Sequence, residues 1–410
     1  MKIFFGVNPV VKTAIRTSIL AGVISFVLIS SSVMYAAANP NPPIGKKVPI
    51  TGDTNQLKKF LNALNESKTK KIRIAHYGDS INWGDIITAD LRQNFQSKFG
   101  GMGAGFQSIC SDDIAVKQTT KHTFNEADWE WASLFTRNLK NYSLGIAGTV
   151  AKSKGNSWVK YEATNFKSSS KSFKTIRLFY NNAKNNCNVS YALNNGAVQN
   201  LKLETGINVN ESIINSSGNV TSVKLNFSSC SSDVNFFGVS LENGNGVYVD
   251  NFPIRGNSGV AIDDIPRNIL SDFQKMLNYK LIILNYGLNI ASPEQTNYTW
   301  YRNKMIKVIN NLKQVFPDAA IILVGVSDKA IKKGTKFVTD SSVLMVLNEQ
   351  KLIAQQTGIA FWNSLEAMGG VNSMNEWVNQ NLALKDYSHF SDAGGKILAD
   401  LLTDAILNVK

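Results

Sequence analysis

Histidine and cysteine are scarce in this chain, with only three of each among 410 residues. No group of these residues has the spacing of metal ligands, and no zinc-finger or other nucleic-acid recognition signature is present. We therefore predict a protein with no metal site and no nucleic-acid partner. Internal repeats are absent as well.

Acidic residues are outnumbered, since 43 Lys and Arg stand against 30 Asp and Glu and give a formal net charge of +13. The basic residues are spread along the chain and form no long run, which favours an anionic setting over a nucleic-acid partner. Solubility alone explains the charge equally well. With 43% hydrophobic residues the chain can bury a core, and its length is enough for two domains.

Charged residues are missing from the apolar stretch 17–38, which follows a basic N-terminal segment. The alanines at 36–38 are small residues suited to cleavage, so residues 1–38 have the layout of a secretory signal peptide. The stretch is also nearly long enough to cross a bilayer, and an uncleaved membrane anchor is the alternative. Both interpretations export the rest of the chain, which begins with a Pro-rich linker at 39–55.

An odd number of cysteines leaves at least one thiol unpaired in an exported chain. Cys187 and Cys230 both lie in the β-rich middle of the sequence, where they can form a disulfide. Three separate buried thiols, Cys110 included, are an equally good interpretation, so the pairing stays open.

Expected strands alternate with expected helices in two parts of the chain. The first part contains a strand at 71–78 and a helix at 83–100. The second, after residue 265, contains strands near 279–287, 319–327 and 359–362, each followed by a helix. This alternation predicts one α/β domain, built from 56–123 and 250–410, with a parallel sheet covered by helices on both faces.

The middle of the chain, residues 124–249, has a different character. Its short β-prone segments are separated by Ser, Asn and Gly, which predicts an antiparallel β-sandwich inserted into the α/β domain. The Gly-rich stretch 100–106 just before it is expected to be a loop. That stretch lacks the Lys-Ser/Thr ending of a phosphate-binding loop, so we predict no nucleotide site there.

Five polar or glycine residues lie at or just beyond the carboxyl ends of expected strands, where open α/β sheets bind ligands. They are Ser80, Gly256, Asn289, Asp386 and His389. Acyl transfer through serine needs an imidazole to take its proton, a carboxylate to orient the imidazole, and N–H donors for the oxyanion. Taken alone, Ser80 is better explained as a helix cap than as a nucleophile, and the adjacent Asp79 as an acceptor that fixes the loop.

Taken together, these residues resemble the conserved blocks of the SGNH hydrolases, also called GDSL esterases. Four blocks match in the family's order: Gly78-Asp79-Ser80, then Gly256, then Gly287 with Asn289, then Asp386 with His389. The resemblance implies a flavodoxin-like three-layer α/β fold. It also implies a Ser80 nucleophile, a His389 base oriented by Asp386, and an oxyanion hole formed by Ser80, Gly256 and Asn289, with no cofactor.

Two departures from the family pattern refine the resemblance. Ile290 stands where the third block often has an acidic residue, and the gap between Ser80 and Gly256 is unusually long. The segment 366–395 resembles the C-terminal part of exported peptidoglycan O-acetylesterase-type members, which carry a carbohydrate-module-like β-sandwich in that gap. This implies a monomeric esterase of the periplasm or cell envelope that removes O-acetyl groups from a polysaccharide, peptidoglycan being the expected substrate.

Two other functions stay open. The same acyl-enzyme supports an O-acetyltransferase if a sugar hydroxyl replaces water, and a non-catalytic glycan-binding protein would keep only the fold. Within the insert, Trp158, Tyr161 and Tyr180 are candidates for stacking on sugar rings, although aromatic residues of this kind more often belong to a core.

Overall fold

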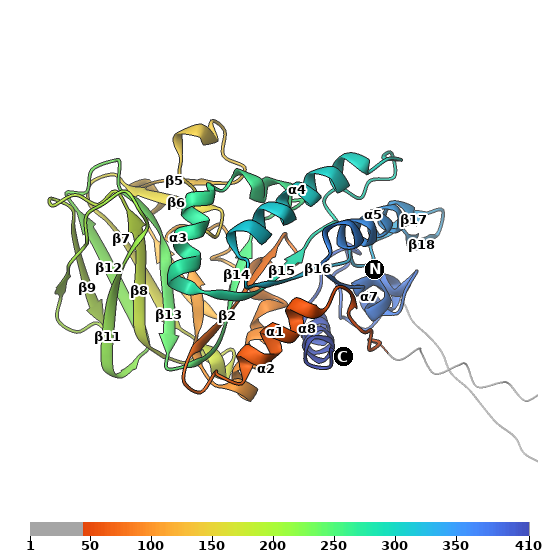
Figure 1. The fold of residues 1–410 in the computed structure, drawn as a ribbon, viewed down its shortest axis with the longest axis horizontal. Helices are drawn as coiled ribbons and strands as arrows, with labels where there is room; N and C mark the ends of the chain where they lie inside the picture. Colours follow the sequence, from red (N-terminus) through yellow and green to blue (C-terminus); the bar gives the residue numbers. More distant parts are fainter. Residues whose placement is uncertain (1–43, 410) are drawn as a thin grey trace, which may run out of the picture. The chain divides into compact units, whose positions relative to one another are not determined.

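The structure is a computed structural model that describes residues 44–409. Its central sheet has the strand order β1-β19-β16-β15-β2-β14, and all neighbours pair in parallel except β1, which is antiparallel to β19 (Figure 1). The strands are β1 (Thr51–Gly52), β2 (Lys71–Gly78), β14 (Gly246–Pro253), β15 (Tyr279–Asn285), β16 (Ala320–Val324) and β19 (Ala360–Trp362). The inner strands are nearly all buried, as expected of parallel strands covered on both faces.

Helices cover both faces of this sheet. One face carries α3 (Arg267–Leu277), α4 (Thr299–Val315) and α5 (Ser341–Thr357). The other carries α1 (Asn55–Leu64), α2 (Thr88–Phe99) and α8 (Asp392–Leu407), with the short helices α6 (Ser364–Met368) and α7 (Ser373–Asn379). This three-layer arrangement confirms the predicted fold class. The helix α3 and the hairpin β17 (Ala330–Lys333) with β18 (Lys336–Thr339) were not predicted.

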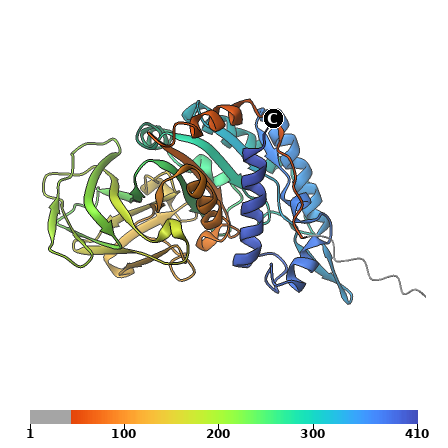
Figure 2. The same ribbon diagram turned by 90° about the horizontal axis from the view of Figure 1, so that it is seen from below.

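The β-rich middle of the chain forms two antiparallel sheets packed around a separate apolar core, which confirms the predicted sandwich. The first sheet contains β4 (Thr120–Phe124), β7 (Ser157–Ala163), β9 (Asn188–Leu193), β10 (Gln199–Leu201) and β12 (Ser222–Ser228). The second contains β3 (Met102–Gln107), β5 (Trp129–Ser133), β6 (Thr149–Ser153), β8 (Phe173–Asn181), β11 (Asn210–Val220) and β13 (Asn235–Asn243). Figures 1 and 2 show the sandwich beside the central sheet.

The predicted limits of the insert, 124 and 249, are wrong at both ends. The sandwich begins with β3, because the Gly-rich stretch expected to be a loop pairs with β13. At the other end, β14 belongs to the central sheet. Glycine is required in β3 because a side chain at Gly103 would collide with the Leu241 carbonyl oxygen, and one at Gly105 with the Asp250 carboxylate.

A buried charge network joins the sandwich to the central sheet. Arg73 of β2 is 1% exposed and pairs with Asp250 of β14 at 2.9 Å and with Glu242 of β13 at 2.6 Å. Arg177 of β8 reaches the same Glu242 carboxylate at 3.4 Å. Burial raises the pKa of Glu242, but the surrounding Arg and Lys side chains outweigh it and hold the pKa well below its ordinary value.

An apolar core continues across the same junction. Phe273 of α3 packs against Phe179 and Phe237 of the sandwich, with ring centroids 5.5 and 5.6 Å apart. Phe106 of β3 likewise lies 5.6 Å from Phe252 of β14. The insert is therefore fused to the α/β part through shared core residues and does not hang from a flexible connection.

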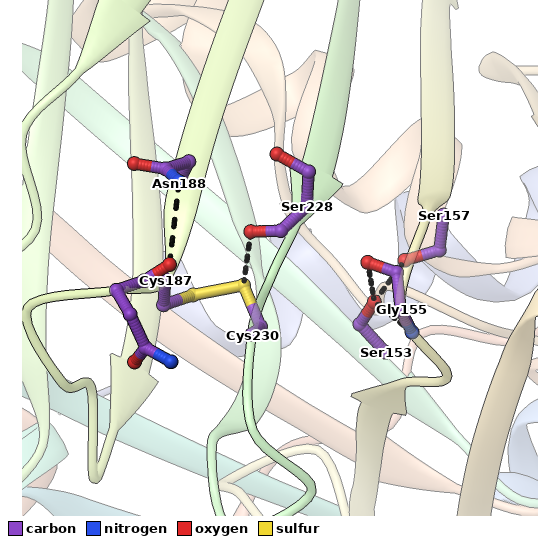
Figure 3. Close-up of a disulfide and its surroundings, with 8 residues drawn as sticks. Ser153, Gly155, Ser157, Cys187, Asn188, Ser228 and Cys230 are labelled. Carbon is purple, nitrogen blue, oxygen red and sulfur yellow. Dashed lines mark hydrogen bonds between the residues drawn. A yellow bond between two sulfur atoms is a disulfide. The ribbon is translucent and has the colours of Figure 1, made fainter.

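Cys187 and Cys230 form a disulfide in the sandwich (Figure 3). Cys110 is a buried free thiol. The paired interpretation, left open by the sequence, is the one that the structure shows. The bridge closes a segment with a sequence separation of 43 residues.

The predicted signal peptide or anchor at 1–38, including the membrane tether at 17–38, lies outside the described residues. Part of the linker 39–55 is described and is folded: Val48 is buried, and its carbonyl accepts a hydrogen bond from the Trp362 indole at 3.1 Å. The linker interpretation is therefore wrong for residues 44–55, which pack against the α/β part. Across residues 44–409, no helix combines the length and the apolar character needed to cross a membrane.

Candidate active site

Ser80 lies just beyond the carboxyl end of β2. Its Oγ is 2.9 Å from His389 Nε2, so the two side chains share a hydrogen bond. The side chain of Ser80 caps no helix, because α2 begins only at Thr88 and the short helix η1 (Trp83–Asp85) has Asn82 at its cap position. The cap interpretation is therefore wrong for the hydroxyl, while the Ser80 carbonyl accepts the Trp83 N–H at 3.3 Å.

A tight turn before α8 brings Asp386 and His389 together. His389 Nδ1 is 2.8 Å from Asp386 Oδ2, while Asp386 Oδ1 accepts the backbone N–H groups of Ser388 and His389 at 2.9 and 3.0 Å. Tyr387 in this turn has a positive φ of 58°. Partial burial raises the pKa of Asp386, but these hydrogen bonds and His389 outweigh it and leave the pKa below its ordinary value, so the carboxylate is ionised.

The other two histidines are buried away from this arrangement. His76 bonds Thr88 through Nδ1 at 2.9 Å, and burial lowers the pKa of its ring to about 3. His122 lies in the sandwich, stacked on Tyr161, and burial lowers the pKa of its ring to about 4. Of the three imidazoles, His389 alone is placed to exchange a proton with Ser80.

Gly256 and Asn289 reach the same edge of the sheet from loops that follow β14 and β15. Gly256 has a φ of +81°, a conformation that glycine adopts readily. Within residues 44–409, the backbone N–H groups of Ser80 and Gly256 donate no hydrogen bond. The Asn289 side-chain amide donates to Asp79 Oδ2 at 2.8 Å and to the Asn257 carbonyl at 3.0 Å, so Asn289 must release one partner to bind an oxyanion.

Asp79 is fully enclosed and fixes the loop, as predicted. Its Oδ1 accepts the Ile81 N–H at 2.9 Å, and its Oδ2 holds the amide of Asn289. Burial raises the pKa of Asp79 to about 7, although the hydrogen bonds and His389 oppose the shift. The link to Asn289 joins residues 210 positions apart, and the sequence contains no signal for it.

The predicted glycan contacts of Tyr161 and Tyr180 are wrong. Both side chains are completely buried, because the inward-facing positions of β7 and β8 point into the sandwich core. Tyr161 donates its hydroxyl to the Ser108 carbonyl at 2.7 Å. Trp158 faces outward on β7, where Lys224 Nζ lies 4.8 Å from its ring centroid.

Residues that could bind a metal ion do not cluster in the described structure. Across residues 44–409, no group of three His, Cys, Asp or Glu side chains is placed to hold a metal ion.

Sequence comparison and structural comparison give different results. No family model and no curated protein sequence matches the chain. Its fold is similar to a solved structure of a peptidoglycan O-acetylesterase, with a TM-score of 0.71 and 21% identity over 87% of this chain and 97% of that one. Because the match spans so much of both chains, it includes the sandwich as well as the α/β part.

Two other solved structures match more weakly. A family two carbohydrate esterase from Cellvibrio japonicus has a TM-score of 0.27, with 10% identity over 70% of this chain and 98% of that one. The acetyl xylan esterase AlAXEase has a TM-score of 0.30, with 16% identity over 39% of this chain and 81% of that one. Matches with TM-scores this low support no conclusion about the fold or the function of this chain. The match at 0.71 confirms the fold expected from the SGNH resemblance.

Proposed function

We propose that this chain is an exported serine esterase that removes O-acetyl groups from a carbohydrate, with peptidoglycan as its substrate. The observation that carries the proposal is the continuous line from Ser80 Oγ to His389 Nε2 at 2.9 Å and from His389 Nδ1 to Asp386 Oδ2 at 2.8 Å. A hydrogen on Nδ1 donated to the carboxylate leaves Nε2 free to accept the proton of Ser80.

The first half of the reaction forms an acetyl-enzyme. Ser80 Oγ attacks the acetyl carbonyl carbon while its proton passes to His389 Nε2. Asp386 stabilises the imidazolium without taking a proton itself. The tetrahedral intermediate collapses when His389 protonates the sugar oxygen, which leaves as the free alcohol while the acetyl group stays on Ser80.

The second half returns the enzyme to its starting state. A water molecule gives a proton to His389 and attacks the acetyl carbonyl, and acetate leaves as Ser80 recovers its proton. In both halves the negative oxygen is held by the N–H groups of Ser80 and Gly256 and by the Asn289 amide. Donors of this kind are each worth about 100- to 1000-fold in kcat when removed one at a time.

Three features support the choice of substrate and compartment. The solved structure with a similar fold is a peptidoglycan O-acetylesterase. The disulfide Cys187–Cys230 suits an oxidising compartment outside the cytosol, in line with the signal-like residues 1–38. The excess of basic residues favours approach to an anionic wall polymer, an attraction that salt weakens.

Acetate release tests the proposal directly. The purified protein is given O-acetylated peptidoglycan and, separately, acetylated xylan, with Ser80→Ala as the inactive variant and Ser217→Ala, an exposed serine of β11, as the matched control. We expect acetate from peptidoglycan, retained in Ser217→Ala and reduced about 10⁴- to 10⁶-fold in Ser80→Ala. Acetate release that persists in Ser80→Ala, or acetyl transfer to added sugar in preference to water, would contradict the proposal.

A further inference from the structure

Arg255 is an exposed cation at the rim of the candidate active site. Its guanidinium carbon lies 5.1 Å from the centroid of the Trp83 indole ring. Among residues 44–409, no carboxylate lies within ion-pair distance of this guanidinium, and Arg255 donates no side-chain hydrogen bond. A guanidinium that lies over an aromatic ring and makes no other bond has N–H groups free for a planar acceptor.

Arg255 and Trp83 are both held close to the reacting atoms by the backbone. Arg255 directly precedes Gly256, whose N–H donates no hydrogen bond within residues 44–409. Trp83 donates its backbone N–H to the Ser80 carbonyl at 3.3 Å, and its indole N–H lies 3.4 Å from Asp112 Oδ1. The backbone therefore places Trp83 beside Ser80, and Arg255 beside Gly256, the two residues whose N–H groups are proposed to hold the oxyanion.

The sandwich supplies an apolar side chain on the same rim. Phe135, in the loop after β5, is 53% exposed. A side chain on Gly256 would come within 3.8 Å of the Phe135 ring, so this phenyl lies beside the backbone proposed to bind the oxyanion. An exposed ring in this position can pack against the C–H face of a sugar whose ester lies at Ser80.

We propose that Arg255, stacked on Trp83 and flanked by Phe135, forms a carboxylate subsite that selects acidic sugars. The bound carboxylate lies on the esterified sugar or on a group attached to it. An arginine pairs with a carboxylate through two parallel N–H···O bonds, which a neutral amide cannot reproduce. The proposal rests on the esterase function for the position of the ester, but carboxylate binding itself does not require turnover.

Binding is measured first, in the Ser80→Ala variant of the full chain, with a muramic-acid disaccharide that carries a free carboxylate and with its carboxamide. We expect the carboxylate to bind about tenfold more tightly at low salt, with the preference weakening as salt is added. Adding Arg255→Gln removes the preference, and adding Arg255→Lys keeps part of it because the charge remains. Equal affinity for the two sugars in the Arg255-containing protein would overturn the subsite.

Turnover is measured next, with the 6-O-acetyl forms of the same two sugars and 4-nitrophenyl acetate. We expect Arg255→Gln to raise KM for the carboxylate sugar about tenfold with kcat little changed, because the lost contact is the same in ground and transition states. The matched control is Lys59→Gln, an exposed cation of α1, which keeps the preference. A fall in kcat of equal size on all three substrates would overturn the subsite and indicate a structural role for Arg255.

The two measurements separate this inference from the esterase proposal. If the protein releases acetate from neither sugar but the binding preference follows Arg255, the subsite stands and the esterase function fails. If both acetylated sugars are hydrolysed at equal rates and Arg255→Gln changes neither, the esterase stands and the subsite fails.

Discussion

The α/β part and the sandwich differ in where their candidate functional side chains lie. In the α/β part, Ser80 and Asn289 lie in loops that follow β2 and β15, and His389 lies in a turn before α8 with its ring bonded to Ser80 Oγ. In the sandwich, the aromatic and polar side chains of greatest interest, Tyr161, Tyr180 and His122, point into the core. Parallel strands collect functional groups at their carboxyl ends, whereas an antiparallel sandwich buries alternate residues along the whole strand.

The two parts nevertheless form one folded unit, because they share buried charges and a continuous apolar core. Arg73 and Glu242 come from different parts and are both almost completely buried. The sandwich therefore supports the catalytic sheet as well as carrying Phe135 to the rim. Removing residues 102–243 would expose this junction and is no clean test of glycan binding.

The largest expected effect separates two histidines, one from each part. His389→Ala should lower kcat/KM for acetate release about 10⁴-fold while leaving the free energy of unfolding nearly unchanged, because the side chain is half-exposed. His122→Ala should cost about 1–3 kcal/mol of stability with the chemistry intact below the melting temperature, since it truncates a core contact with Tyr161. Acetate-release assays at 25 °C measure the first effect and urea unfolding measures the second. Equal losses of activity in the two variants would contradict the assignment of His389 to catalysis and His122 to the core.

A slightly smaller effect tests whether the two parts unfold together. Glu242→Gln leaves the guanidinium of Arg73 without one of its buried partners and should lower the free energy of unfolding by about 3–5 kcal/mol. Glu211→Gln is the matched control, because Glu211 pairs with Arg177 at a partly exposed position and should cost under about 1 kcal/mol. In wild-type protein, activity and tryptophan fluorescence should be lost in a single urea transition. If activity persists at urea concentrations that unfold the sandwich, the two parts unfold separately.

The third prediction contrasts two buried carboxylates. Glu242 is surrounded by cations, whereas Asp79 is held mainly by neutral N–H donors, so burial wins at Asp79 and raises its pKa to about 7. Its ordinary value is 3.8, so folding favours the protonated form. The stability from this group is full below pH 4 and is lost as pH rises through 7.

Asp79→Asn should therefore flatten the fall in unfolding free energy between pH 4 and 8, a difference of roughly 4 kcal/mol at most. The same variant should lower activity at pH 8, because the ionised carboxylate is what holds the amide of Asn289. Chemical denaturation at pH 5 and pH 8 measures the first effect. An unchanged slope with pH would show that Asp79 does not titrate in this range.

The elements that were predictable from sequence have local signals. The strand at 71–78 and the helices that became α4, α5 and α8 show clear periodicity. Ser80, Gly256 and Asn289 follow strand ends as expected, whereas Asp386 and His389, also expected at a strand end, lie in the turn between α7 and α8. The strand β3 escaped prediction because glycine is depleted in strands, and its partner β13 lies more than a hundred residues away. The side of the sheet on which Tyr161 lies depends on the register of β7 with its neighbours, which the sequence does not reveal.

Contacts between distant segments explain what else was missed. The stacking of Arg255 on Trp83 and the bond from Asn289 to Asp79 each join loops from different strands, and neither residue pair has a spacing that marks it in the sequence. The position of Phe135 depends on how the sandwich docks on the sheet, where the two parts meet through the buried network around Arg73 and the shared apolar core. Sequence thus located the groups that the proposed reaction needs, but not the residues that surround them.

The smallest expected effect concerns the disulfide, which lies wholly within the sandwich (Figure 3). Replacing Cys187 and Cys230 together by alanine frees a segment with a sequence separation of 43 residues in the unfolded chain and should cost about 2–4 kcal/mol. If the sandwich and the α/β part are one cooperative unit, this local change lowers the stability of both, and activity and fluorescence shift to lower urea together. Cys110→Ala, which removes a buried thiol outside the bridge, is the control for core truncation. A double variant that loses sandwich structure at low urea but still releases acetate from 4-nitrophenyl acetate would show that the α/β part folds independently, despite the charges that the two parts share.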